Sequence, residues 1–92
     1  MSLEMNQRED DGVTVVDLRG RLVQGPEATA LRERFNELEK AQVKNVILNF
    51  KQIYFIDSTG LGMLVAVHAH MEKAGGTVEI LAPKREAAEA AA

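Results

Sequence analysis

Cysteine is absent from this 92-residue chain, and its absence excludes several kinds of chemistry. A chain without cysteine has no disulfide framework, no thiolate nucleophile and no zinc site of the finger or ribbon type. Disulfides are typical of oxidising compartments, so their absence fits a reducing cytoplasm. We therefore expect a cytoplasmic protein.

An excess of positive charge is also missing. Eleven Lys and Arg residues stand against fourteen Asp and Glu residues, which gives a formal net charge of −3. This charge provides no general attraction to nucleic acid phosphates or anionic lipid, so we expect neither as a partner. Long apolar runs are missing too, since a membrane-spanning helix needs about 20 such residues and the start shows no signal-peptide pattern. We expect a soluble chain without a membrane segment.

The residues that are present indicate a folded protein. Hydrophobic residues make up 46% and charged residues 27% of the chain, a balance typical of globular rather than disordered proteins. A chain of this length encloses one small core, and we see no internal repeat or linker. Residues 1–92 are therefore expected to form a single domain.

The first third of the chain predicts a hairpin followed by a helix. Residues 13–19 are rich in β-branched side chains and follow a loosely alternating segment and the turn sequence Asp10-Asp11-Gly12. Pro26 suits the first turn of a helix. Apolar residues then recur every three or four positions up to about Ala41, which predicts an amphipathic helix: Ala28, Leu31, Phe35 and Leu38.

The remainder alternates strands and helices. Residues 45–49 contain a short apolar run typical of a buried strand, and we expect a loop over residues 50–56. A helix then begins near Asp57-Ser58-Thr59, which are favourable N-cap residues, and ends at Gly75-Gly76. Residues 77–81 predict another strand.

The last segment, stopped from continuing the strand by Pro83, is charged and alanine-rich, so residues 84–92 predict a helical tail. The order is β-β-α-β-α-β-α. Strands connected through helices favour parallel pairing. The fold class is α/β, with a small mixed, mainly parallel sheet flanked by helices.

Metal-dependent catalysis finds little support among the side chains. His68 and His70 point about 200° apart on a helix, so they cannot share one ion. His68 and Glu72 have the spacing of an ordinary exposed helical pair. We assign no metal site and no cofactor.

A serine nucleophile and a phosphate loop are also disfavoured. Ser58 is next to Asp57, a weak base at its usual pKa of about 4, and His68 is about 15 Å farther along the same helix. Gly60-Leu61-Gly62 lacks the lysine of a P-loop and the third glycine of a dinucleotide fingerprint. We therefore expect no catalytic residues and no enzymatic activity.

Asp57-Ser58-Thr59-Gly60 most simply caps a helix, and capping is compatible with a signalling role. A helix N-terminus has unsatisfied N–H groups and a partial positive charge. A phosphate added to a hydroxyl there is tolerated by the fold.

The helix that follows has an unusually wide apolar arc. By helical spacing, its apolar side chains cover about 200°, more than packing on one side of a sheet requires. Leu61, Leu64 and Val65 are the better core candidates, while Met63 and Val67 are candidates for an apolar docking face beside Ser58. The alternative is that a neighbouring helix covers these two.

These features resemble the STAS family, named for sulfate transporters and anti-sigma factor antagonists, and specifically its stand-alone bacterial antagonists. The resemblance spans residues 13–81 and rests on four segments: Leu18-Arg19-Gly20-Arg21-Leu22, Val46-Ile47-Leu48-Asn49-Phe50, Ile56-Asp57-Ser58-Thr59-Gly60-Leu61-Gly62, and Gly75-Gly76. It implies a sheet flanked by helices, no catalytic activity and partner switching.

In such partner switching, the unphosphorylated antagonist captures an anti-sigma factor that is also an ATP-binding serine kinase with a histidine-kinase-like fold. The kinase phosphorylates the antagonist and so releases it. By position, the phospho-acceptor implied here is Ser58, with Asp57 and Thr59 beside it. The expected partner-binding surface consists of these three residues, Gly60, and the docking-face candidates Met63 and Val67.

Two departures from the family pattern bear on this assignment. Val23 stands where antagonists commonly carry an acidic residue, so one polar element of the kinase-contacting surface is missing. The family usually continues for about twenty more residues, so the last helix is expected to be lacking. Uncovered apolar surface would then favour a homodimer.

Two functions stay open on the sequence. The first is a phosphorylation-controlled anti-sigma factor antagonist, which Ser58 favours. The second is a structural STAS module, such as a stressosome component or a lipid-transport subunit, that binds constitutively, and Val23 favours this second reading.

Overall fold

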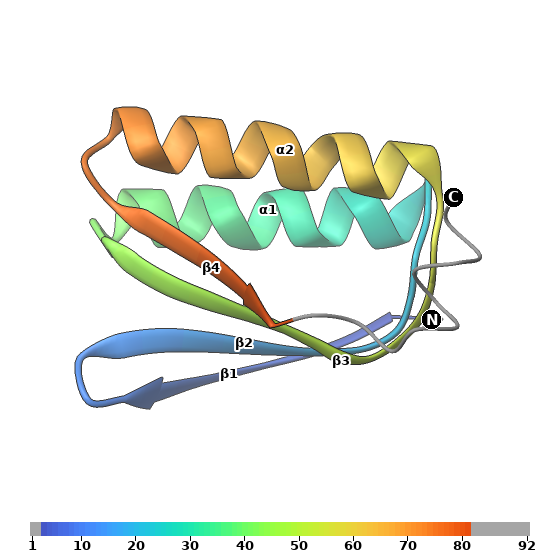
Figure 1. Ribbon diagram of the computed structural model, residues 1–92, viewed down its shortest axis with the longest axis horizontal. Helices are drawn as coiled ribbons and strands as arrows, with labels where there is room; N and C mark the ends of the chain where they lie inside the picture. The colour runs from blue at the N-terminus through green and yellow to red at the C-terminus, as the bar shows by residue number, and fades with distance from the viewer. Residues whose placement is uncertain (1–2, 82–92) are drawn as a thin grey trace.

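The computed structural model describes residues 3–81, which form a four-stranded sheet and two helices (Figure 1). The elements in chain order are β1 (Leu3–Asp10), β2 (Val13–Leu22), α1 (Pro26–Lys40), β3 (Asn45–Ile56), α2 (Ser58–Lys73) and β4 (Thr77–Leu81). The predicted order is therefore confirmed up to β4. The expected helical tail, residues 84–92, lies outside the described residues.

The sheet has the strand order β1-β2-β3-β4. β1 pairs antiparallel with β2, whereas β2 with β3 and β3 with β4 are parallel, as the sequence predicted. The hairpin turn has Asp11 at φ 56° and Gly12 at φ 82°, and Asp10 pairs directly with Val13. Two central residues with positive φ match the right-handed twist of the flanking strands.

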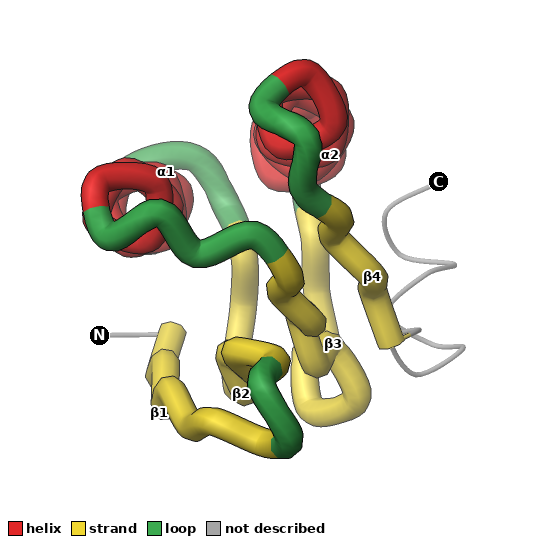
Figure 2. Tube along the Cα trace, turned by 90° about the vertical axis from the view of Figure 1, so that its left-hand side faces the viewer, coloured by secondary structure: helices red, strands yellow, loops and turns green. Residues whose placement is uncertain are grey.

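Both helices lie on the same face of the sheet, side by side (Figure 2). This arrangement follows from two successive right-handed crossovers, β2-α1-β3 and β3-α2-β4, that advance in the same direction across the sheet. The core fills the space between the helices and the sheet. Its most completely buried large side chains are Phe50, Leu22, Leu31, Leu48, Ile53, Val16 and Val46.

The loop expected over residues 50–56 is wrong, because β3 continues to Ile56. Asp17 pairs with Asn49 but Arg19 pairs with Gln52, and a second register shift follows between Gly20 and Arg21. β3 therefore contains two more residues than β2 over this stretch, as β-bulges do. Its buried side chains fall at Phe50, Ile53 and Ile56, a spacing that hides the alternation expected of a strand.

The C-terminal end of α2 agrees with the predicted glycine stop. Gly75 has φ +82° and donates its N–H to the carbonyl of Glu72 at 3.0 Å, and Gly76 donates to the carbonyl of Met71 at 3.0 Å. A residue in the left-handed region that returns hydrogen bonds to the last turn is a common helix end. Thr77 then donates to the carbonyl of Lys44 at 2.7 Å, which starts β4 beside β3.

Candidate functional site

The candidate site lies where the two central strands end. β2 ends at Leu22 and β3 ends at Ile56, and the N–H of Asp57 donates to the carbonyl of Leu22 at 3.2 Å. The loop before α1 and the first turn of α2 therefore meet at the carboxyl edge of the sheet. Ser58, which follows Asp57 directly, lies at this edge, where partner sites of open α/β sheets gather.

Asp57 caps α2 and also holds the neighbouring loop. One carboxylate oxygen, Oδ1, accepts the N–H of Gly60 at 2.8 Å, and the other, Oδ2, accepts the N–H of Gln24 at 2.9 Å. These two backbone donors hold the pKa of the Asp57 carboxyl below its usual range, with Gln24 making the larger contribution. The cap was predicted, but the bond to Gln24 joins residues far apart in the sequence.

A pH-dependent stability is expected from this carboxylate. In the unfolded chain its pKa is about 4, and in the fold it is lower, so its stabilisation is present above about pH 4 and is lost as the pH falls through the lowered value. Asp57→Ala should therefore melt below the wild type at pH 7, and the gap between the two should narrow below pH 4. Thermal melts by circular dichroism measure this.

A second carboxyl group also contributes to the pH dependence of stability. The pKa of the Asp17 carboxyl is lowered, mainly by its hydrogen bond from Arg8. Because Asp17 is present in both the wild type and Asp57→Ala, its contribution cancels in the difference between their melting temperatures. A gap in melting temperature that is constant from pH 7 to pH 2 would contradict an ionic cap.

Ser58 is the first residue of α2 and is exposed, as is Thr59. The hydroxyl of Ser58 is therefore accessible to another protein. A phosphate on it would lie beside the N–H groups of the first turn, where the helix carries its partial positive charge. With both oxygens of Asp57 engaged by backbone N–H groups and its pKa lowered, Asp57 is a poor base for activating Ser58 as a nucleophile.

Gly60 allows the first turn of α2 to approach β2 closely. A Cβ built at this position would lie 2.6 Å from the carbonyl oxygen of Leu22 and 3.1 Å from a methyl group of Ile56. The buried Gly60 therefore fixes how near the start of α2 lies to the sheet. This packing role was not visible in the sequence, where Gly60 and Gly62 are two positions apart in one helix, yet a Cβ built at Gly62 has nothing within 4 Å.

The apolar side chains of α2 divide between core, groove and solvent. Leu64 is buried as predicted, but the core assignment is wrong for Leu61, which is 41% exposed, and for Val65, which is 70% exposed. At about 100° per residue these two lie within about 60° of Ser58 around the helix. Met63 and Val67 are half-buried and line a groove beside α1.

The two histidines of α2 have separate partners. His68 Nδ1 lies 3.7 Å from a carboxylate oxygen of Glu72, which confirms the exposed helical pair. His70 Nε2 lies 2.5 Å from Glu39 on α1. Within residues 3–81, no three His, Asp or Glu side chains are grouped so that they could hold a metal ion. Neither helix in this part of the chain is long and apolar enough to cross a membrane.

The mixed sheet, the two crossover helices on one face and the capped helix start at its carboxyl edge place this chain among the small α/β domains of β-β-α-β-α-β order. Residues 4–92 match the STAS domain family, and the chain belongs to that family.

The chain is also similar to individual proteins described as anti-sigma factor antagonists. The chain is 24% identical over 80 residues to an anti-sigma F factor antagonist from Paenibacillus polymyxa, covering 87% of this chain and 68% of that protein. The crystal structure of an anti-sigma factor antagonist from Mycobacterium paratuberculosis superposes with a TM-score of 0.81 and 20% identity, covering 96% of this chain and 73% of that one.

The anti-sigma factor antagonist SpoIIAA in its unphosphorylated form gives a TM-score of 0.74 at 20% identity, covering 94% of this chain and 79% of that one. The fold also occurs inside a larger protein: 87% of this chain matches only 20% of the Mglu chain, with a TM-score of 0.75 and 21% identity. At these identities the structures show a shared fold.

Proposed function

We propose that this protein is an anti-sigma factor antagonist whose capture of an anti-sigma factor kinase is controlled by phosphorylation of Ser58. The observation that carries the proposal is the position of Ser58, exposed at the first residue of a helix that is capped by Asp57 and tied to the neighbouring loop. The related antagonist SpoIIAA has been solved both unphosphorylated and phosphorylated, which supports a phosphorylated state of this fold. The protein acts by binding, without catalysis of its own.

The proposed binding surface centres on the start of α2. Asp57, Ser58 and Thr59 present polar groups at the carboxyl edge, and Gly60 sets the height of the helix above the sheet. Leu61 and Val65 continue the same helix face as exposed apolar side chains. A few large side chains in such a patch commonly dominate the affinity of an interface.

Met63 and Val67 remain proposed partner contacts, but their half-buried position beside α1 gives them less surface to offer. The two apolar pairs of α2 can therefore be compared directly. They lie on the same helix, are matched in residue type as one long and one β-branched side chain, and differ in exposure.

Replacing Leu61 and Val65 together by alanine should weaken binding of the unphosphorylated protein by at least tenfold, or about 1.4 kcal/mol, with little change in melting temperature. Both side chains leave solvent on binding but pack little in the free domain. Met63→Ala with Val67→Ala should instead lower the melting temperature and affect binding less. Calorimetric titration with the anti-sigma factor and thermal melts measure the two effects, and the reverse ranking would contradict this surface.

The same exposed apolar face supports a homodimer, which is a further prediction. Exposed apolar patches on small proteins tend to be covered by a second copy of the chain or by another protein. Light scattering of Leu61→Ala with Val65→Ala beside the wild type tests it, with a dimer expected only for the wild type. A monomer for both proteins at every concentration would contradict the dimer.

A constitutive structural STAS module is the second candidate, and Val23 favours it. This residue is half-buried in the loop held by Asp57, and its carbonyl accepts the N–H of Ala28 at 3.1 Å. It therefore offers an apolar side chain where an acidic one would serve kinase recognition. Mass spectrometry of the protein isolated from its own cells distinguishes the two, because only the switch requires a phosphorylated fraction, at Ser58.

A further inference from the structure

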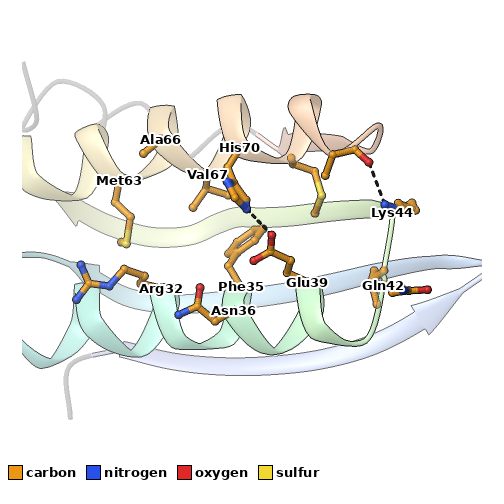
Figure 3. A pocket seen from close by; sticks show the side chains of 13 residues that line it. Arg32, Phe35, Asn36, Glu39, Gln42, Lys44, Met63, Ala66, Val67 and His70 are labelled. Carbon is orange, nitrogen blue, oxygen red and sulfur yellow. Dashed lines mark hydrogen bonds and ion pairs between the residues drawn. The ribbon is translucent and has the colours of Figure 1, made fainter.

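A groove runs between α1 and α2 (Figure 3). Its volume is about 320 Å³, at the low end of the range of about 300–1,000 Å³ that is usual for ligand pockets. A volume of this size suits one short chain rather than a lipid with several chains.

The interior of the groove is apolar. Phe35 from α1 is 8% exposed and Met71 from α2 is 7% exposed, and both belong to the hydrophobic core. Met63 and Val67 pack against that core from α2 and complete the lining. Two methionines give the lining a soft, adaptable surface, since thioether side chains fit irregular apolar ligands.

Polar groups on part of the rim are already engaged. Glu39 from α1 and His70 from α2 meet across the groove at 2.5 Å (Figure 3). At the end near the helix C-termini, the amino group of Lys44 donates to the carbonyl of Ala74 at 2.9 Å. The acidic group on this rim is thereby occupied, and so is one of its cations.

Arg32 is the charged residue at the opposite end of the groove, and it is exposed (Figure 3). Within residues 3–81 it has no hydrogen bond or ion pair. The helix positions three and four residues away carry no acid: Ala28, Thr29, Phe35 and Asn36. Across the groove, α2 has no acidic residue before Glu72. A cation therefore stands at the mouth of an apolar groove without a counter-charge, and the amide of Asn36 lies one turn farther along.

We propose that this groove binds a medium-chain fatty acid, with the acyl chain over Phe35, Met63 and Val67 and the carboxylate on Arg32. The single short chain follows from the small volume and the apolar lining, and the anionic head follows from the unmatched charge of Arg32. The groove shares Met63 and Val67 with the proposed partner surface, but Asp57, Ser58, Thr59 and Gly60 do not line it. Ligand binding in the groove is therefore tested without the anti-sigma factor and without phosphorylation of Ser58.

The test uses decanoate and the uncharged 1-decanol as probes in calorimetric titrations of the full chain. Decanoate should bind the wild type at least about tenfold more tightly than decanol, the size of one charge-assisted hydrogen bond. Arg32→Gln should remove this preference and leave decanol binding unchanged. Arg19→Gln, an exposed arginine on β2 outside the groove, is the matched control and should keep the preference.

A second variant places the ligand. Ala66 lines the groove and is exposed, so Ala66→Trp should fill the groove and abolish binding of both probes while the melting temperature is retained. If this variant does not fold, the binding site is mapped on the wild type instead, by the changes that decanoate causes in the NMR chemical shifts of the backbone amides. The proposal is overturned by equal affinities for the two probes, by equal losses in the two arginine variants, or by no decanoate binding. Self-association that Ala66→Trp removes would assign the groove to a second copy and overturn it too.

Discussion

Phosphorylation of Ser58 is expected to weaken binding to the anti-sigma factor by at least a hundredfold while the fold stays intact. The fold should survive because the phosphate, with about −1.5 to −2 charges, lies at the N-terminus of α2. Binding should suffer because the phosphate must be desolvated within the interface beside the Asp57 carboxylate. A penalty of about 3 kcal/mol already corresponds to roughly a hundredfold. Titration calorimetry of both forms measures it.

Three variants separate the parts of this switch. Ser58→Ala should bind constitutively and resist phosphorylation, and Ser58→Asp should fold but bind poorly. Thr59→Ala, the adjacent exposed hydroxyl, is the control and should remain phosphorylatable. Equal affinities of the phosphorylated and unphosphorylated proteins would refute the switch and favour the constitutive module.

Alanine at Gly60 and at Gly62 should change stability in opposite directions. The added methyl group at Gly60 meets the carbonyl oxygen of Leu22 at 2.6 Å, and neither backbone can give way easily. We expect a loss of about 1–3 kcal/mol, as for other overpacked sites. At Gly62 the methyl group meets nothing, and the better helix propensity of alanine should add up to about 1 kcal/mol.

Denaturant unfolding and thermal melts measure the pair. For a domain of this size, 1 kcal/mol shifts the melting temperature by about 4–8 °C, so the two variants should be clearly separated. Two stabilising substitutions would mean that the start of α2 can lift from β2 at no cost. That result would contradict the role assigned to Gly60.

The sequence predicted the element order and the start of α2 because those signals are local. Turn residues, β-branched runs and cap residues act within a few positions of the chain. The end of β3 was missed since its bulges exist only relative to β2, and no period along one segment reveals them. The bond between Asp57 and Gln24 was missed for the same reason, because 33 positions separate the two residues.

The faces of α2 show a second limit of sequence reasoning. Its apolar arc was correctly judged too wide for one packing surface, but which part faces α1 depends on the direction of the crossovers. That direction placed Met63 and Val67 against α1 and left Leu61 and Val65 in solvent. When the apolar arc of a helix is wider than its packing surface, hydrophobicity alone does not predict which of its side chains are buried.

The side-by-side helices have an electrostatic consequence for the whole edge. Since each connects two parallel strands, α1 and α2 run in the same direction and both begin at the carboxyl edge (Figure 1). Each helix start carries about half a positive charge from its aligned peptide dipoles. In parallel helices these ends add, whereas in an antiparallel pair they would oppose. The carboxylates of Glu27, in the first turn of α1, and of Asp57, the cap of α2, lie at these two helix starts and offset their positive ends. The backbone of both helices, and not of α2 alone, therefore reduces the repulsion that an added phosphate on Ser58 meets at this edge.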